Sequence, residues 1–246
     1  MTNDANILLI NINNTNTSFA LATPARIGRV VRQPTATLRE LPFDARRIRA
    51  VVLSSVVPAA TKRILPKLPV KPLLVTGTAN LGIGVRYPQK NQIGADRLAN
   101  AVAAIRLYGS PAIVVDFGTA VTFDIVNARG EYIGGVIAPG LSAVTDYLYQ
   151  RTALLPRIKL TEPRSVVGKS TAGAMRVGAV IGYRGLVKEI LAALRREPGM
   201  ERAHIVATGG YAKLIAHKIP AITHVNPMLT LEGMRFIYLH NIHEQD

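Results

Sequence analysis

The sequence predicts an α/β protein made of two related halves, and three observations lead to this fold class. Strand-like apolar runs alternate with segments of helical periodicity along the 246 residues, as in α/β proteins. Two strand–turn–strand segments resemble each other, with Asn11-Ile12-Asn13 in the first matching Asp116-Phe117-Gly118 in the second. Hydrophobic residues make up 48% of the chain and charged residues 18%, which allows a sizeable core. We therefore expect an N-terminal half, 1–110, and a C-terminal half, 111–246, with a cleft between them.

The first half begins with a hairpin and then alternates strands with helices. Residues 7–21 have the pattern of a strand, a polar turn and a second strand, and residues 48–58 that of a buried strand. The segment Ala95–Leu107 has apolar residues at helical spacing. Between them we expect a short helix, a strand and a turn-rich loop, over 60–68, 71–77 and 80–94.

The second half repeats the opening pattern and then becomes helical. A hairpin is expected over 112–126, and the glycine-containing residues 127–140 continue it as a meander. Helical periodicity covers 141–150 and 170–196, and residues 204–216 have the pattern of a strand, a Gly-Gly turn and a helix.

Composition excludes several classes of protein. The chain has no cysteine, which excludes disulfides, thiolate metal sites and a cysteine nucleophile. Its apolar runs are much shorter than the roughly 20 residues that a membrane helix needs. The first ten residues carry an acid and no basic residue, unlike a secretory signal. We expect a cytoplasmic protein without a membrane partner.

The chain is strongly basic, with a formal net charge of +15. Such a charge raises the local concentration of anions, which suits a nucleotide or a phosphorylated substrate and also nucleic acid. The basic residues are scattered, with short clusters only at 44–50, 61–67 and 194–202. A generally solvated basic surface is the favoured interpretation, and nothing else in the sequence supports nucleic-acid binding.

The segment "DFGTAVTFD" carries residues suited to a phosphate and a cation. Gly118 lets the backbone approach an anion, Thr119 and Thr122 offer hydroxyl donors, and Asp116 can hold a cation that bridges to phosphate. A tight hairpin whose Asp and Thr bond to their own backbone would use the same residues. The pattern D-x-G-T leaves both interpretations open.

The segment "GADR" lies where a loop enters the helix expected from Ala95. Asp96 there is favoured by the helix macrodipole, which is the structural interpretation. The functional alternative makes Asp96 a base that accepts a proton from a substrate hydroxyl, with Arg97 binding an anionic group. The chain has no P-loop motif, which argues against a P-loop kinase.

Six segments, taken in order, resemble the type III pantothenate kinases, a family that includes the Bvg accessory factors. The resemblance spans about residues 7–240. The segments are "GADRLANAVAA", "DFGTAVTFDIV", "YIGGVIAPGL", "LPRIKL", "VVGKSTAGAMRVGAVIGYRGLV" and "ATGGYAKLI".

The resemblance implies an acetate and sugar kinase/Hsp70/actin-like fold, with two ribonuclease-H-like halves around a nucleotide cleft. It implies transfer of the γ-phosphate of ATP to the terminal hydroxyl of pantothenate, the first step of coenzyme A synthesis. Mg²⁺, a monovalent cation (K⁺ or NH₄⁺) and a homodimer are implied as well.

The resemblance also assigns roles to individual residues. Asp96 matches the general base and Asp116 the acid tied to the monovalent cation. The substrate pocket is matched by Tyr87, Gly94, Arg97 and Thr171, with Thr171 acting across the dimer. The nucleotide and phosphate loops are matched by Asn11, Asn14, Thr15, Gly118 and Thr119.

The first phosphate loop departs from the family pattern. Family members have D-x-G-N-T there, whereas this chain has Asn11 for the acid and Asn13 for the glycine. Asparagine keeps the shape of aspartate but loses the charge that would organise Mg²⁺ and the phosphates. Losing one such electrostatic group costs about 10²–10³ in rate in other enzymes. Two alternatives therefore stay open: an impaired pseudokinase with a regulatory binding role, and a kinase of another small hydroxyl-bearing acceptor.

Overall fold

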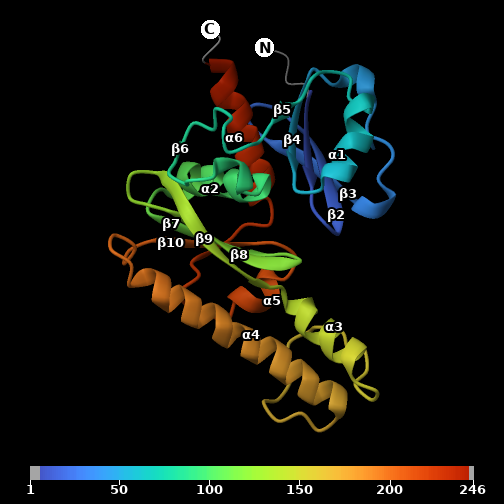
Figure 1. Cartoon of the computed structure of the whole chain (residues 1–246), viewed down its shortest axis with the longest axis vertical. Helices are drawn as coiled ribbons and strands as arrows, with labels where there is room; N and C mark the ends of the chain where they lie inside the picture. Colours follow the sequence, from blue (N-terminus) through green and yellow to red (C-terminus); the bar gives the residue numbers. More distant parts are fainter. Residues whose placement is uncertain (1–5, 244–246) are drawn as a thin grey trace. The chain divides into compact units, whose positions relative to one another are not determined.

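The computed structural model describes residues 6–243 and divides into two compact units (Figure 1). The first unit comprises the chain up to Tyr108, Gly130–Ile133 and the residues from Met228 onward. The second comprises Gly109–Arg129 and Gly134–Pro227. The C-terminal segment thus packs with the N-terminal residues. The two-domain division at residue 110 stays a prediction.

The first unit is built on a five-stranded mixed sheet. Its strand order is β3-β2-β1-β4-β5, with β1 antiparallel to β2 and parallel to β4. The strands are β1 (Ile7–Ile12), β2 (Asn16–Ala22), β3 (Ile27–Pro34), β4 (Ala50–Ser55) and β5 (Leu73–Leu74).

Helices cover both faces of this sheet. Side chains of alternate residues in β1, including Leu8 and Ile10, share a buried cluster with Ile64 of α1 (Pro58–Ile64). On the opposite face, α2 (Ala95–Tyr108) and α6 (Leu229–His243) contact β4, and α6 also contacts β1. Short 3₁₀ helices occupy Thr35–Thr37, Ala45–Arg47, Leu65–Lys67 and Lys90–Gln92.

The second unit contains the other mixed sheet. Its order is β11-β10-β7-β8-β9, and the two-residue β6 pairs with the first residues of β9, Glu131 and Tyr132, which belong to the first unit. The strands are β6 (Gly84–Val85), β7 (Ala112–Phe117), β8 (Ala120–Val126), β9 (Glu131–Pro139), β10 (His204–Thr208) and β11 (His224–Val225).

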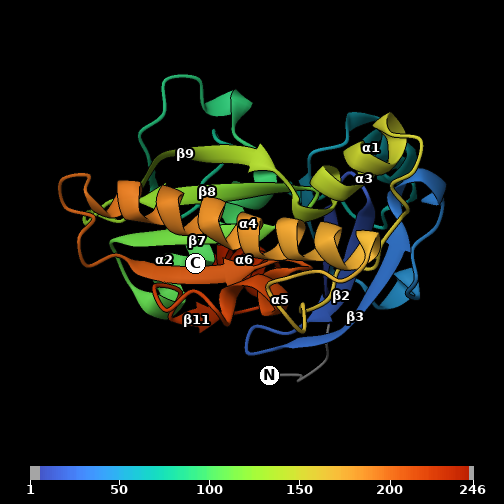
Figure 2. The same cartoon turned by 90° about the horizontal axis from the view of Figure 1, so that it is seen from below.

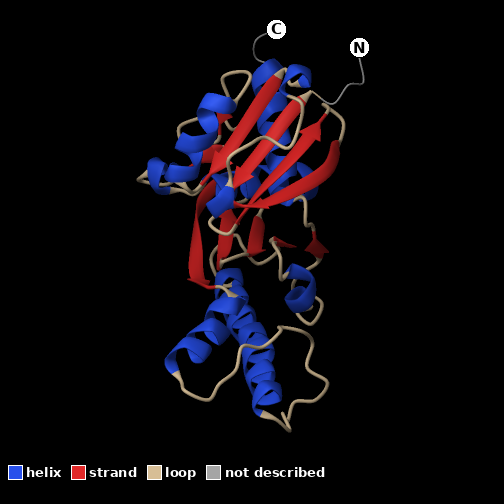
Figure 3. Cartoon of the chain, turned by 90° about the vertical axis from the view of Figure 1, so that its right-hand side faces the viewer, coloured by secondary structure: helices blue, strands red, loops and turns tan. Residues whose placement is uncertain are grey.

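A long helix covers one face of this second sheet. Figure 2 shows α4 (Thr171–Arg195) lying across β7, β8 and β9, and Val180, Tyr183 and Val187 of α4 join Phe117 in the core. Two shorter helices, α3 (Leu141–Arg151) and α5 (Ala212–Ala216), pack against α4. The connection from α3 to α4, tan in Figure 3, has no helix or strand.

Most expected elements are confirmed, and several elements were missed. Both hairpins and the helices expected from Ala95 and near 170 are present, the last unbroken despite its glycines. The sequence interpretation missed β3, and it missed β11 and α6, which lie beyond the last element it named. It also expected only a loop where the two-residue strand β6 lies. No helix within residues 6–243 is both long and apolar enough to cross a membrane.

The closest helix packing in the first unit joins α2 to α6. A Cβ on Gly233 of α6 would lie 1.8 Å from the backbone oxygen of Ala99 in α2. Beside this contact, the Thr230 hydroxyl donates a 2.8 Å hydrogen bond to Oδ1 of the buried Asn100. Only glycine allows this approach, since the opposing atom belongs to helical backbone.

We expect Gly233→Ala to destabilise the protein by about 1–3 kcal/mol, because the added methyl group forces the two helix backbones apart. Gly185→Ala is the matched control. Gly185 is exposed in the interior of α4, with no atom within 4 Å of its added Cβ, so alanine should stabilise by about 0.5–1 kcal/mol. Urea unfolding midpoints measure both effects, and equal midpoints for the two variants would contradict this packing argument.

Candidate functional site

Asn11 lies near the end of the central strand β1 and is 5% exposed. It pairs with Ser18 of β2 and Ser54 of β4 in the sheet register. The Ser54 hydroxyl donates a 3.0 Å hydrogen bond to Asn11 Oδ1. The amide orientation is therefore fixed, and its NH₂ group is the donor that remains for a ligand.

The turn after β1 is held from outside by Thr35. Its hydroxyl donates to the backbone oxygen of Asn13 at 2.6 Å, while the Asn13 N–H donates to the Asn16 oxygen at 3.2 Å. No non-glycine residue among those described has a positive φ, so Asn13 adopts this turn without left-handed strain. Asn14 and Thr15 are exposed at the tip.

The Asn13 side chain is nevertheless unusual. Its Oδ1 is buried and has no hydrogen-bond partner in the part of the chain that the structure describes. What asparagine adds here, relative to glycine, is side-chain volume and an unsatisfied acceptor rather than backbone strain.

The second candidate loop contains Asp116, Gly118 and Thr119 at the β7–β8 turn. The Gly118 N–H donates to the Ala120 oxygen at 3.0 Å, and Asp116 is partly buried. A Cβ on Gly118 would make only ordinary contacts, at 3.4 Å or more. The structure therefore does not require glycine at 118 for its own packing.

Two other glycines do enclose this loop. Gly209 has φ +91°, and a Cβ there would lie 2.5 Å from Asp116 Oδ1. A Cβ on Gly140 would lie 2.2 Å from the backbone oxygen of Thr119. Both glycines are required by close approach to the Asp116–Thr119 turn.

Asp96 lies in the first turn of α2 and is partly buried. Burial raises the pKa of its carboxyl group, and the hydrogen bond from the Arg97 backbone and the charge of Arg97 act in the opposite direction. The Arg97 N–H donates to Asp96 Oδ1 at 2.9 Å. A Cβ on Gly94 would lie 2.7 Å from that same oxygen, so glycine makes room for the carboxylate.

Two expected substrate-binding residues meet around a third residue that the sequence interpretation did not name. Tyr132, at the start of β9, is fully buried. The rings of Tyr87 and Tyr132 are 6.3 Å apart between centroids, and the Arg97 guanidinium carbon is 5.9 Å from the Tyr132 centroid. The Arg86 N–H also donates to the Tyr132 oxygen at 2.9 Å. The cluster brings Tyr87 and Arg97 together.

Tyr132 gave only a weak signal in the sequence. It stands in "YIGG", which was quoted for the resemblance, but a tyrosine in a strand is usually a packing residue. Its contact with Arg97 depends on the pairing of β6 with β9, which connects Val85 to Tyr132. That pairing joins two segments far apart in the chain and has no local pattern.

Thr171 is the first residue of α4 and is exposed. The preceding Ser170 caps the helix, with its hydroxyl accepting from the Gly173 N–H at 3.1 Å. Thr171 belongs to the second unit, whereas Tyr87, Gly94, Asp96 and Arg97 belong to the first. The structure therefore groups four of the five acceptor-side residues within one unit.

Clustered oxygen ligands for a cation are sparse in the part of the chain that the structure describes. No group of three or more His, Asp or Glu side chains suitable for a metal ion occurs among the described residues. Asp116 offers one carboxylate beside the backbone of the glycine-enclosed turn. That donor set fits a hard cation whose remaining ligands are phosphate oxygens and water.

Solved structures of similar fold confirm the fold class. A conserved Baf family protein from Campylobacter jejuni matches with a TM-score of 0.64 at 18% identity, covering 96% of this chain and 99% of the other. An archaeal actin homologue gives 0.51 at 10% identity, covering 98% and 99%. A Listeria monocytogenes protein described as a candidate N-acetylmannosamine kinase gives 0.52 at 11% identity, with coverage of 98% and 99%.

Sequence comparisons identify the family. The chain is 50% identical over 234 residues to a type III pantothenate kinase of Akkermansia muciniphila, covering 93% of this chain and 96% of that protein. It is 44% identical over 203 residues to one of Moorella thermoacetica, covering 81% and 80%. The family model for type III pantothenate kinase matches residues 7–193. The chain belongs to the type III pantothenate kinase family.

Proposed function

We propose that this protein transfers the γ-phosphate of ATP to the terminal hydroxyl of pantothenate in the cytoplasm, the first step of coenzyme A synthesis. The observation that carries the proposal is Asp96, a partly buried carboxylate of raised pKa at the start of α2, next to Arg97. A carboxylate with a raised pKa is a stronger base than one with the ordinary pKa of an exposed aspartate. Family membership supplies the acceptor.

The acceptor side is formed by the first unit. Asp96 accepts the proton of the attacking hydroxyl as the oxygen–phosphorus bond forms and the bond to the leaving ADP breaks. Arg97 binds an anionic group of the acceptor, and its contact with the Tyr132 ring limits the positions of the guanidinium. Gly94 leaves the Asp96 oxygen unobstructed.

The donor side is proposed to use both loops. Asn14 and Thr15 at the first turn, and Gly118 and Thr119 at the second, bind phosphate oxygens through backbone N–H groups and hydroxyls. Asn11 contributes its NH₂ group. When bound, Mg²⁺ and a monovalent cation, K⁺ or NH₄⁺, neutralise phosphate charge, and Asp116 is the residue we propose to hold the monovalent ion.

A homodimer is proposed from an unusual surface. Large exposed apolar side chains concentrate in the second unit over residues 137–181, which comprise the end of β9, α3, the connection to α4 and the first half of α4. An apolar surface of this kind favours association. Thr171, proposed to contact pantothenate across the dimer, lies within the same segment. The exposed side chains are Ile137, Val144, Tyr147, Tyr149, Leu154, Val166, Val167 and Ile181.

Asn11 and Asn13 favour one second candidate, a binding protein with little or no phosphotransfer. The Asn11 substitution removes a negative charge near the expected phosphate position, and Asn13 adds a side chain there. If this candidate is correct, the protein binds nucleotide and acceptor but releases no phosphopantothenate. A mass-spectrometric assay for phosphopantothenate separates the two candidates, and testing other hydroxyl-bearing acceptors covers a changed substrate.

We expect Asp96→Asn to reduce turnover by about 10²–10⁴ while raising the melting temperature. The raised pKa means that the folded state favours the protonated form, so ionised Asp96 destabilises the protein at neutral pH. Protonated Asp96 stabilises the folded protein. This contribution is complete below the ordinary Asp pKa of 3.8 and is lost as pH rises through the raised pKa. Turnover should fall as pH decreases through that same raised pKa.

Asp44→Asn is the matched control for Asp96→Asn. Asp44 also accepts a hydrogen bond from a nearby backbone N–H, that of Arg46, but hydrogen bonds from Arg46 lower its pKa. We expect unchanged turnover and no gain in melting temperature. Normal turnover by the Asp96→Asn variant of an active protein would exclude Asp96 as the base.

We expect Asn11→Asp to increase turnover by at least about tenfold and to lower the Mg²⁺ concentration needed for half-maximal rate. The Ser54 hydroxyl can donate to a carboxylate as it does to the amide, so the side chain keeps its orientation. Asn16→Asp, an exposed position in the same hairpin, adds equal charge and should have little effect. Equal rates for all three proteins would show that charge at position 11 is unimportant.

We expect the parent protein to be a dimer in light-scattering measurements, and Leu154→Glu combined with Val167→Glu to give a monomer with a raised KM for pantothenate. Charges on the apolar surface oppose its burial. Leu107→Glu places one such charge on an exposed leucine of the first unit, and this variant should remain dimeric. A monomeric parent that phosphorylates pantothenate would contradict the dimer proposal.

A further inference from the structure

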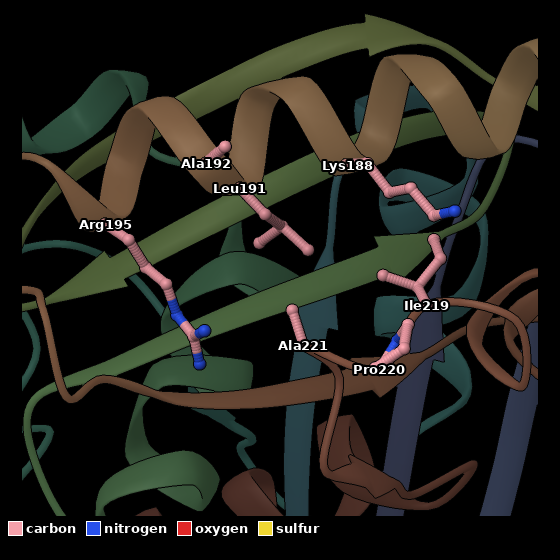
Figure 4. A pocket seen from close by; sticks show the side chains of 7 residues that line it. All are labelled: Lys188, Leu191, Ala192, Arg195, Ile219, Pro220 and Ala221. Carbon is pink, nitrogen blue, oxygen red and sulfur yellow. The ribbon is translucent and has the colours of Figure 1, made fainter.

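A cavity of about 300 Å³ lies in the second unit, outside every residue given a role above. It lies between the C-terminal half of α4 and the chain just after α5 (Figure 4). We call it the α4 cavity. It is lined by Lys188, Leu191, Ala192, Arg195, Ile219, Pro220 and Ala221.

The α4 cavity combines an apolar floor with two cations. Leu191 and Ile219 are each 1% exposed and form part of the main core. Lys188 and Arg195 are seven residues apart on α4, so they lie on one helix face. In Figure 4 they stand at opposite ends of the cavity, with Leu191 between them. No acidic side chain lines the cavity.

Arg195 is the residue that indicates a ligand. Its Nε is buried and has no hydrogen-bond partner within the described residues. The Nε of Arg184 on the same helix is also buried without a partner, but both terminal guanidinium nitrogens of Arg184 donate, to Glu162 and to the Leu214 oxygen. The terminal nitrogens of Arg195 have no such partner within the described residues. Within residues 6–243, neither Arg195 nor Lys188 has a carboxylate within ion-pairing distance.

We propose that the α4 cavity binds a small organic anion. Its carboxylate or phosphate contacts the Arg195 guanidinium, and its short apolar body lies on the accessible Ala192, Pro220 and Ala221, beside the buried Leu191 and Ile219. The terminal guanidinium nitrogens of Arg195 have no carboxylate within ion-pairing distance among the described residues, and an anionic oxygen would give them a charge-assisted bond. Ligand cavities typically begin near this volume, which suits only a compact molecule. The proposal does not depend on the kinase reaction.

The test is calorimetric titration of the full-length protein with four probes: hexanoate, butyl phosphate, neutral hexanamide and inorganic phosphate. We expect both organic anions to bind, and hexanamide and inorganic phosphate to bind at least about tenfold more weakly, since each lacks one half of the recognition. The organic anion that binds with the higher affinity shows whether the cavity prefers a carboxylate or a phosphate head group.

Variants locate the binding. Arg195→Gln should weaken binding of the organic anion with the higher affinity by at least about tenfold, because it removes the charge that contacts the anion. Arg196→Gln is the control, since Arg196 is the exposed neighbour outside the lining, and it should bind like the parent. Ala221→Leu fills the cavity without changing any charge and should also abolish binding. Melting curves confirm that each variant is folded.

Three results would overturn the proposal. They are no binding of either organic anion, equal binding of hexanoate and hexanamide, and unchanged affinity in folded Arg195→Gln. Binding that survives in Ala221→Leu would place the anion elsewhere on this basic protein and would overturn it as well.

Discussion

The close packing of α2 against α6 is the constraint on which the acceptor side of the site depends. Asp96 and Arg97 occupy the first turn of α2, so the direction of that helix sets where the carboxylate lies. The helix backbones approach at Gly233, where no side chain fits against Ala99. Gly233, near the end of the chain, thus helps to fix the position of Asp96, the proposed base. This packing explains why the C-terminal segment belongs to the first unit.

The same arrangement carries a conflict between stability and chemistry. Burial that raises the pKa of Asp96 makes it a better base and also makes its ionised form unfavourable in the folded protein. Gly94 reduces steric conflict, because any Cβ at that position would overlap the carboxylate oxygen. The hydrogen bond from the Arg97 backbone N–H replaces part of the hydration that the Asp96 carboxylate loses on burial. A capping aspartate alone would need neither the burial nor the glycine.

Local patterns predicted the hairpins, the α2 helix and the segments that identify the family, because period and turn chemistry are encoded in neighbouring residues. Contacts between distant segments left no such pattern. Tyr132 meets Tyr87 and Arg97 only through the pairing of β6 with β9. Gly209 looked like a common turn glycine, yet its necessity comes from Asp116 on a neighbouring strand. For the same reason, α6 gave no signal as the partner of α2.

Asn11 illustrates how a fold can be indifferent to a change that its chemistry is not. The strands on either side of β1 fix the position of Asn11, and the Ser54 hydroxyl can donate to an amide oxygen as readily as to a carboxylate. Neither packing nor hydrogen bonding within the sheet therefore distinguishes asparagine from aspartate here. Asn13 adds no left-handed strain to the turn. The difference that bears on phosphotransfer is the charge presented to the phosphates and their Mg²⁺. Stability is affected separately, because a carboxylate at the buried position 11 would lose hydration and the Asn13 Oδ1 is buried without a partner among the described residues.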